Sequence, residues 1–125
     1  MYQREQLIQH YIESYNNFDV EGMLKDLDED VQFENRSGGE VNLSIKGLSA
    51  FKEQAEKAKG FFSERQQTIK RFQHNSTQTE IEIDYQAILA IDLSNNLKKG
   101  DALDLKGKSI FTFEDSKIIA ITDIS

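Results

Sequence analysis

The sequence predicts an α+β fold in which amphipathic helices cover a sheet and leave a pocket. An apolar and aromatic stripe recurs at helical spacing from residue 7 to residue 18. Apolar residues occupy every second position from residue 81 to residue 93, and hairpin signals lie near residues 38 and 115. Because the helical stripe carries two tyrosines, whose hydroxyls need polar partners when buried, we expect that helix to lie over a concave surface.

Two helices are predicted at the start of the chain. The stripe of the first helix consists of Leu7, Ile8, Tyr11, Ile12, Tyr15 and Phe18. Asp19 can accept hydrogen bonds from the free N–H groups of a second helix. The apolar face of this second helix is Val20, Met23, Leu24 and Leu27. The acidic run at residues 28–30 is predicted to end the second helix.

A hairpin and a third helix are predicted next. The strands Val31–Arg36 and Glu40–Ile45 are joined by Ser37-Gly38-Gly39, and glycines supply the positive φ angles of a tight turn. Gly47 precedes a helix for which Gly60 is a stop signal. The core-facing stripe of this helix is predicted to be Leu48, Phe51, Ala55, Ala58 and Phe62.

The second half of the chain is predicted to be strands. Residues 65–73 form a polar edge strand, and Thr79–Leu93 form one long strand with alternating apolar residues. After a loop at Asn95–Asp101, Ala102–Glu114 and Lys117–Ile124 pair as a hairpin around Asp115-Ser116.

The last of these strands is apolar on both faces. Alternation places Ile119 and Ile121 on one face, and Ile118, Ala120 and Ile124 on the other. Helices cover one face of such a sheet, so the second face needs another cover. A loop or the curled sheet itself could cover it, but we expect a homodimer through this sheet face.

Composition limits the possible partners and location. The 125 residues suit a single domain spanning 1–125, and the net charge of −7 argues against nucleic acid and anionic membrane surfaces as partners. No apolar stretch is long enough to cross a bilayer, and no signal peptide is visible, so we expect a cytoplasmic protein. Cysteine is absent and histidine occurs twice, so no metal site is expected.

Several motifs together resemble the nuclear-transport-factor-2-like superfamily, and most closely its SnoaL-like and ketosteroid-isomerase-like members. These motifs are Tyr11-x-x-x-Tyr15-Asn16-x-x-Asp19-x-x-Gly22-Met23, Leu27-x-x-Asp30-Val31-x-Phe33, Ile45-Lys46-Gly47 before Phe51, Ile110-Phe111-Thr112-Phe113, and Lys117-Ile118-Ile119. The resemblance implies a cystatin-like cone, in which a strongly curved, mostly antiparallel sheet wraps a long N-terminal helix with two further helices. It also implies an apolar cavity open at one end and, in many members, a homodimer.

The resemblance implies specific catalytic positions, which this sequence fills in part. Ketosteroid isomerases need a carboxylate base and two hydrogen-bond donors for the developing oxyanion. Tyr11 stands at one donor position, but Asn35 stands where the base would be and Ser109 where the second donor would be. Because an amide has no usable basicity, ketosteroid isomerisation is not expected.

Asp123 is the alternative acid, because it shares a face with Ile121 by alternation. Some SnoaL-like cyclases use an aspartate deep in this cavity. The competing interpretation is a solvated side chain at a frayed C-terminus. Likewise, Tyr11 and Tyr15 are either core tyrosines with satisfied hydroxyls or pocket residues, and Asn35 fits either the pocket mouth or a hairpin cap.

The preferred hypothesis is that the cavity binds a small, mostly apolar organic molecule without a cofactor. The predicted walls are Tyr11, Tyr15, Phe18, Phe33, Phe51, Phe62, Tyr85, Phe111 and Phe113, with Asn35, Ser109 and Asp123 as polar groups. One alternative is a cofactor-free isomerase, cyclase or dehydratase that uses Asp123 and Tyr11. A second alternative is a non-catalytic dimerisation or partner-binding module with a filled core.

Overall fold

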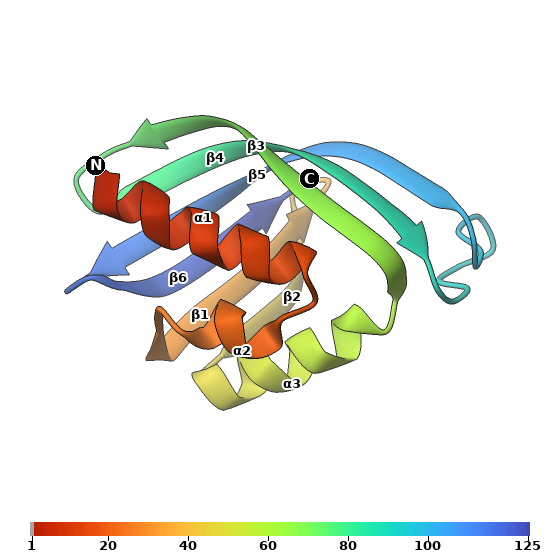
Figure 1. Cartoon of the computed structure of the whole chain (residues 1–125), viewed down its shortest axis with the longest axis horizontal. Coiled ribbons are helices and arrows are strands. Elements are labelled where there is room, and N and C mark those ends of the chain that lie inside the picture. The colour runs from red at the N-terminus through yellow and green to blue at the C-terminus, as the bar shows by residue number, and fades with distance from the viewer. Residues whose placement is uncertain (1) are drawn as a thin grey trace.

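The computed structural model describes residues 2–125, and its three helices lie on one face of a curved six-stranded sheet (Figure 1). The strand order is β2-β1-β6-β5-β4-β3, with β1 and β6 parallel and every other neighbouring pair antiparallel. The helices are α1 (Tyr2–Asn16), α2 (Val20–Leu24) and α3 (Leu48–Lys59). The strands are β1 (Leu27–Ser37), β2 (Glu40–Lys46), β3 (Phe62–His74), β4 (Gln78–Leu89), β5 (Ala102–Glu114) and β6 (Lys117–Ile124). The predicted α+β fold, with a curved sheet around a long N-terminal helix, is confirmed.

The junction between α1 and α2 is built from a left-handed residue and a side-chain cap. Phe18 has φ 58°, and its N–H donates to Tyr15 O at 3.1 Å while Asp19 N–H donates to Ser14 O at 2.8 Å. This bond pair defines a helix C-terminus whose left-handed position is usually glycine. Asp19 Oδ1 then accepts from Gly22 N at 3.0 Å, as the sequence predicts for the cap of the second helix.

The boundary between α2 and β1 differs from the prediction. The second helix ends at Leu24, so Leu27 and the acidic residues 28–30 belong to a strand rather than to a helix end. Leu27 pairs in parallel with Ile118, and Leu27 and Val31 are both buried in the core. Pairing with β6 therefore outweighs the local signal of the acidic run, whose side chains stay at the surface.

The bounds of β3 and β4 also differ from the prediction. β3 begins at Phe62, which was assigned to the third helix, and β4 ends at Leu89 instead of Leu93. The chain after Leu89 turns back on itself, with Leu93 N–H donating to Leu97 O at 2.8 Å. Ile91 and Leu93 are consequently 40% and 42% exposed rather than on an apolar sheet face.

A bulge in β6 changes which residues reach the core. Thr112 pairs with Ala120 while Phe113 pairs with Ile118, so Ile119 is an extra residue. Ile118 and Ile121 are therefore both buried, where plain alternation placed them on opposite faces. The outer face loses Ile118, one of the apolar residues behind the dimer expectation, and the homodimer stays a prediction.

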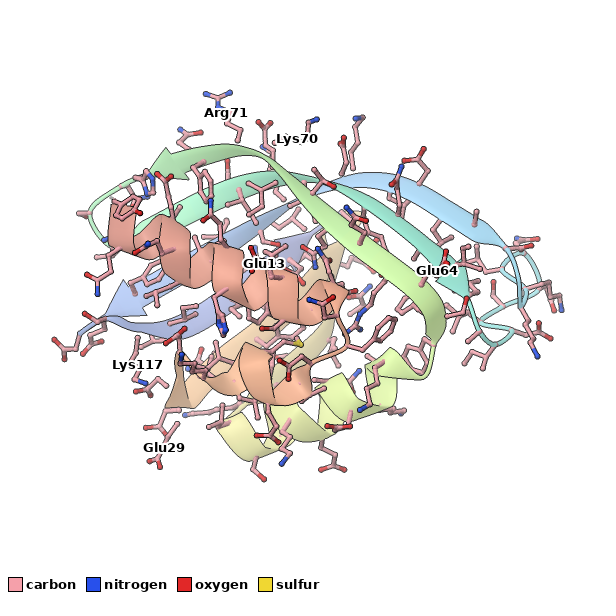
Figure 2. The ribbon with its side chains drawn as sticks, in the orientation of Figure 1. Glu13, Glu29, Glu64, Lys70, Arg71 and Lys117 are labelled. Atoms are coloured by element: carbon pink, nitrogen blue, oxygen red, sulfur yellow. The ribbon has the colours of Figure 1, made fainter. Side chains whose placement is uncertain are left out.

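The core lies between α1, the start of α3 and the concave face of the sheet. Its fully buried side chains include Ile8, Ile81, Phe111 and Ile118. Charged side chains such as Glu29, Lys70 and Arg71 point away from it (Figure 2). In the described range 2–125, no helix has the length and apolar character needed to span a bilayer.

Candidate functional site

A cavity of about 320 Å³ lies beyond the filled core, between the C-terminal half of α1, α3 and the sheet. Its walls are mainly apolar and aromatic, and a small number of polar side chains reach it. This is the composition typical of sites for small organic molecules. The wall residues predicted from the sequence that the structure places here are Tyr11, Tyr15, Phe33, Phe51 and Tyr85, together with the polar Asn35, Ser109 and Asp123.

The other four predicted wall residues lie elsewhere. Phe111 is 0% exposed and forms part of the core, with its ring edge-on to Tyr11 at 5.7 Å between centroids. Phe113 lies under the guanidinium of Arg4, and Phe62 packs edge-on against Tyr85.

Phe18 stacks on Arg65 and borders a neighbouring hollow. Each of these four rings is a core or supporting contact rather than a cavity wall, because a neighbouring ring or cation covers it.

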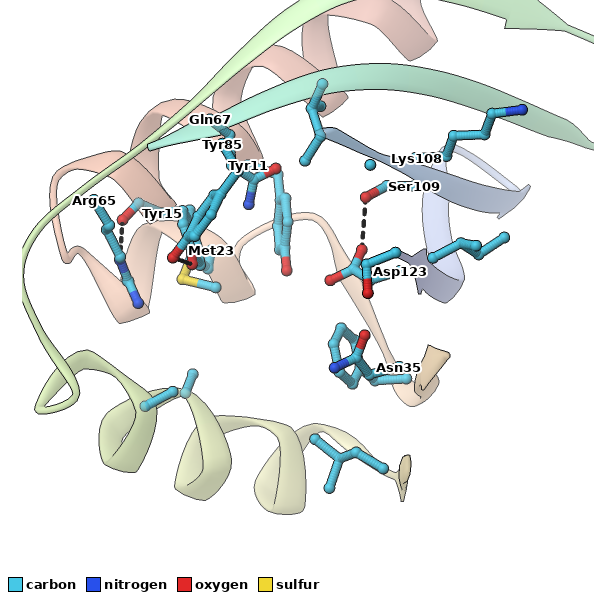
Figure 3. Close-up of a pocket in the computed structure, with 18 of the residues that line it drawn as sticks. Tyr11, Tyr15, Met23, Asn35, Arg65, Gln67, Tyr85, Lys108, Ser109 and Asp123 are labelled. Carbon is cyan, nitrogen blue, oxygen red and sulfur yellow. Dashed lines mark hydrogen bonds between the residues drawn. The ribbon is translucent and has the colours of Figure 1, made fainter. Parts of the chain in front are cut away.

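Asp123 and Ser109 form the polar end of the cavity. They are cross-strand partners on β6 and β5, and Ser109 Oγ donates to Asp123 Oδ1 at 2.6 Å (Figure 3). Asp123 is partly buried in a paired strand, and the following Ser125 N–H donates to Arg36 O at 2.9 Å. The side chain is therefore a cavity group and not a solvated one at a frayed end.

Burial raises the pKa of the Asp123 carboxyl to about 6, and the hydrogen bond from Ser109 opposes this rise. Desolvation is the larger effect because the charged carboxylate loses water that one hydroxyl replaces only in part. Near pH 6 this carboxyl is therefore divided between its protonated and charged forms, whereas an ordinary surface aspartate is charged, so its carboxylate is the stronger base of the two.

Tyr11 projects from α1 toward the same space as Asp123 (Figure 3). It is 7% exposed, and burial, followed by the negative charge of Asp123, raises the pKa of its phenol well above the usual value. Its hydroxyl is thus protonated at any physiological pH. Within residues 2–125 this hydroxyl has no hydrogen-bond partner, so it can donate to a bound molecule.

Tyr15 and Tyr85 form one side wall. Their hydroxyl oxygens are 2.9 Å apart, and burial raises the pKa of both phenols. The pair uses one of its two protons internally, so one donor remains for another acceptor.

Arg65 and Gln67 on β3 also reach the cavity, and the sequence reasoning missed them. Arg65 is 5% exposed; its Nε donates to Tyr15 O at 2.8 Å. Gln67 is held by Asn16, whose side chain bonds both the N–H and the carbonyl of Gln67, at 2.7 and 3.1 Å.

The sequence predicts residues 65–73 as a polar edge strand, and this prediction does not identify Arg65 and Gln67 as cavity residues. The available signal was alternation: Arg65 and Gln67 share the parity of Ile69, which packs on the core.

Residues 2–125 contain no group of three or more His, Cys, Asp or Glu side chains arranged to hold a metal ion. His74 instead bonds Glu5 at 2.7 Å and Thr79 at 2.8 Å, and His10 lies 3.7 Å from Asp26.

The chain belongs to the SnoaL-like domain family, whose model matches residues 8–121. This match covers all the elements that build the cavity except the first residues of α1 and the last of β6. No curated protein sequence matches the chain.

Several solved structures share the fold. A proposed polyketide cyclase from Xanthomonas campestris pv. campestris is 23% identical, with a TM-score of 0.84 over 98% of this chain and 90% of that one. TerC, co-crystallised with polyporic acid, is 18% identical, with a TM-score of 0.78 over 98% and 90%. An LEH-like epoxide hydrolase from M. tuberculosis is 15% identical, with a TM-score of 0.74 over 95% and 79%. At these identities the likeness establishes the fold alone.

Proposed function

We propose that the chain binds a small, mostly apolar organic molecule with a carbonyl oxygen and exchanges a proton with it through Asp123. The observation that carries this proposal is the placement of a carboxyl with a pKa of about 6 and an unpartnered tyrosine hydroxyl on one cavity. The first group can take up or release a proton near neutral pH, and the second can donate a hydrogen bond.

The chemistry follows from the two roles. The Asp123 carboxylate would remove a proton from a carbon next to the carbonyl, and Tyr11 would donate a hydrogen bond to the oxygen as it becomes negative. The protonated Asp123 would then return its proton to the molecule. Delivery to a different carbon of the enolate system completes an isomerisation, whereas delivery to a β-hydroxyl completes a dehydration in which the C–O bond breaks, a C=C bond forms and water leaves. Alternatively, the enolate carbon would attack a second carbonyl of the same molecule to form a C–C bond, and Asp123 would protonate the resulting alkoxide, which completes a cyclisation.

Other proteins with this fold support a small organic ligand: one is a proposed polyketide cyclase, one is an LEH-like epoxide hydrolase, and TerC was crystallised with polyporic acid. A dimerisation module with a filled core agrees less well, because it predicts no such cavity and a Tyr11 hydroxyl bonded within the protein.

Mass spectrometry of the purified protein, under native and then denaturing conditions, tests binding first. We expect a bound organic molecule that is released on denaturation.

Proton exchange is then tested with that molecule in D₂O, where the wild type should incorporate deuterium and Asp123→Asn should not. Asp104→Asn, which changes an exposed carboxylate, is the matched control and should keep the wild-type rate. Equal exchange by wild type and Asp123→Asn would contradict the proposed role.

A further inference from the structure

Arg65 is a buried cation without an anionic partner. Its side chain is 5% exposed, and within the described residues no carboxylate lies within 4.0 Å of it. Its Nη2 atom is buried and makes no hydrogen bond. A buried charge with an unused N–H group is costly unless a partner supplies an acceptor, so Nη2 calls for an explanation.

The aromatic rings around Arg65 do not provide that acceptor. The guanidinium carbon lies 3.7 Å from the centroid of Tyr15 and 4.5 Å from that of Phe18. These contacts stabilise the charge through the faces of the rings. The N–H groups of a guanidinium lie in its plane, so stacked rings leave them unsatisfied.

The same contacts hold Arg65 in one position. Its Nε donates a hydrogen bond to Tyr15 O. The ring of Phe18, whose backbone is left-handed with φ 58°, packs against the guanidinium. A non-glycine residue in that region costs about 1–2 kcal/mol. The contact with the guanidinium explains why a bulky aromatic residue occupies this left-handed position, because the ring of Phe18 helps to hold Arg65 in place.

The cavity also has the opposite charge balance from the rest of the chain. The whole sequence has a net charge of −7, whereas the charged residues lining the cavity are Arg65, Lys106, Lys108 and Asp123. Lys106 pairs with Asp84 at 3.0 Å, which leaves Arg65 as the buried cation of the wall. A local excess of positive charge favours an anionic molecule.

We propose that Arg65 binds the carboxylate of an organic acid, at the end of the cavity opposite Asp123. Figure 3 shows Arg65 and Asp123 on opposite sides, with the tyrosines between them. A carboxylate at Nη2 would satisfy the unused N–H group through a charge-assisted hydrogen bond.

The buried Gln67 Oε1, which also lacks a partner, lies on the same strand and would accept from a hydroxyl of the ligand. This proposal deepens the proposed function, because it names the substrate class and its orientation. The acid group points to Arg65 and the reacting carbonyl to Asp123.

Two probes with the same ring system test the charge requirement: 2-naphthoate and the neutral 2-naphthamide. We expect the wild type to bind naphthoate about tenfold more tightly or better, as measured by calorimetry at pH 8. Arg65→Gln should bring the two affinities to within about twofold. Lys70→Gln, which removes an exposed cation from the same strand, is the matched control and should keep the wild-type preference.

Arg65 also ties β3 to α1, so Arg65→Gln could fail to fold. The Nε–H resonance of Arg65 in the wild type provides a second readout that needs no variant. It should shift on addition of naphthoate and stay in place on addition of naphthamide.

Equal binding of the two probes by the wild type, or an unchanged preference in folded Arg65→Gln, would overturn the role of Arg65 and leave proton exchange at Asp123 intact. A wild type that binds neither probe would overturn this inference, whereas the proposed function is overturned separately, by absent deuterium exchange with its own ligand.

Discussion

The two ends of the space beneath α1 differ in what fills them. At the closed end, Ile8, Ile81, Phe111 and Ile118 exclude solvent completely. At the open end, the same helix contributes Tyr11 and Tyr15 to a cavity of about 320 Å³. The helix and the sheet continue across both ends, so the change is made by side chains. Aliphatic residues and Phe111 fill one end, and aromatic residues with polar tips line the other.

The energetic consequence is that substitutions should cost more at the closed end. A filled core loses both transfer free energy and packing when a side chain is shortened, whereas a cavity wall already faces open space. Polar and titratable groups are tolerated at the open end for the same reason. Four predictions test this contrast, from the largest expected effect to the smallest.

Shortening a phenylalanine at each end gives the largest expected difference. Phe111→Ala should lower the free energy of unfolding by about 3–5 kcal/mol, because Phe111 is fully buried. Phe33→Ala should cost about 1–2 kcal/mol, because Phe33 is partly buried and borders the cavity. Urea unfolding followed by circular dichroism measures both values. Equal losses would mean that the open end is packed like the core.

Asp123→Asn should stabilise the protein above about pH 6. The pKa of Asp123 is raised to about 6 in the folded state, so the wild type gains stability from protonation at low pH and loses it as pH rises through 6. The variant keeps a neutral side chain throughout. It should therefore be more stable by about 1–3 kcal/mol at pH 8, with the difference vanishing below about pH 4.

Urea unfolding of wild type and Asp123→Asn across this pH range measures the effect. Asp104→Asn, at an exposed carboxylate, controls for the general effect of removing a negative charge. A difference between wild type and Asp123→Asn that does not change with pH would contradict the raised pKa.

Ser109→Ala should raise the pKa of the Asp123 carboxyl. The hydroxyl of Ser109 stabilises the Asp123 carboxylate through the 2.6 Å hydrogen bond, so its loss should move the pKa of Asp123 above 6. The free energy of unfolding at pH 8 should fall by about 1–2 kcal/mol. A lower pKa of Asp123 in the variant would show that the hydroxyl does not donate to the carboxylate.

Phe18→Gly and Phe18→Ala together separate backbone strain from ring contact. Both lose the contact with Arg65, but only alanine keeps the unfavourable left-handed backbone at φ 58°. The glycine variant should be more stable than the alanine variant by about 1 kcal/mol, as measured by thermal unfolding. Identical stabilities would indicate that the backbone relaxes out of the left-handed region.

The sequence predicts the closed end better than the open end. Periodicity identifies Ile8, Ile12 and Ile81 as core residues, and the Gly38-Gly39 hairpin has the positive φ angles that were expected. These features depend on local spacing. The β6 bulge does not, because the extra residue at Ile119 is set by pairing with β5 and β1. Alternation therefore misplaced Ile118 but still placed Asp123 correctly, since no bulge lies between Ile121 and Asp123.

Within the cavity, the sequence analysis misses Arg65 and Gln67 of β3. Both lie in a polar segment, where alternation with Ile69 indicates a shared face but does not indicate that the cation of Arg65 is buried. The burial of Arg65 depends on Tyr15 of α1 and on Phe18 of the α1–α2 junction, about fifty residues away in the chain. Conversely, Phe111 and Phe113 were assigned to the cavity because their aromatic type suits a wall, whereas one fills the core and the other packs under Arg4.

A direct measurement of the Asp123 titration tests the central claim, that the open end holds a carboxyl ready to exchange a proton near neutral pH. The ¹³C resonance of its carboxyl carbon can be followed by NMR from pH 3 to pH 9, with Asp123→Asn used for assignment. The account predicts a midpoint near 6. A midpoint at the ordinary aspartate value of about 3.9 would contradict it, because Asp123 would then be solvated and fully ionised at neutral pH.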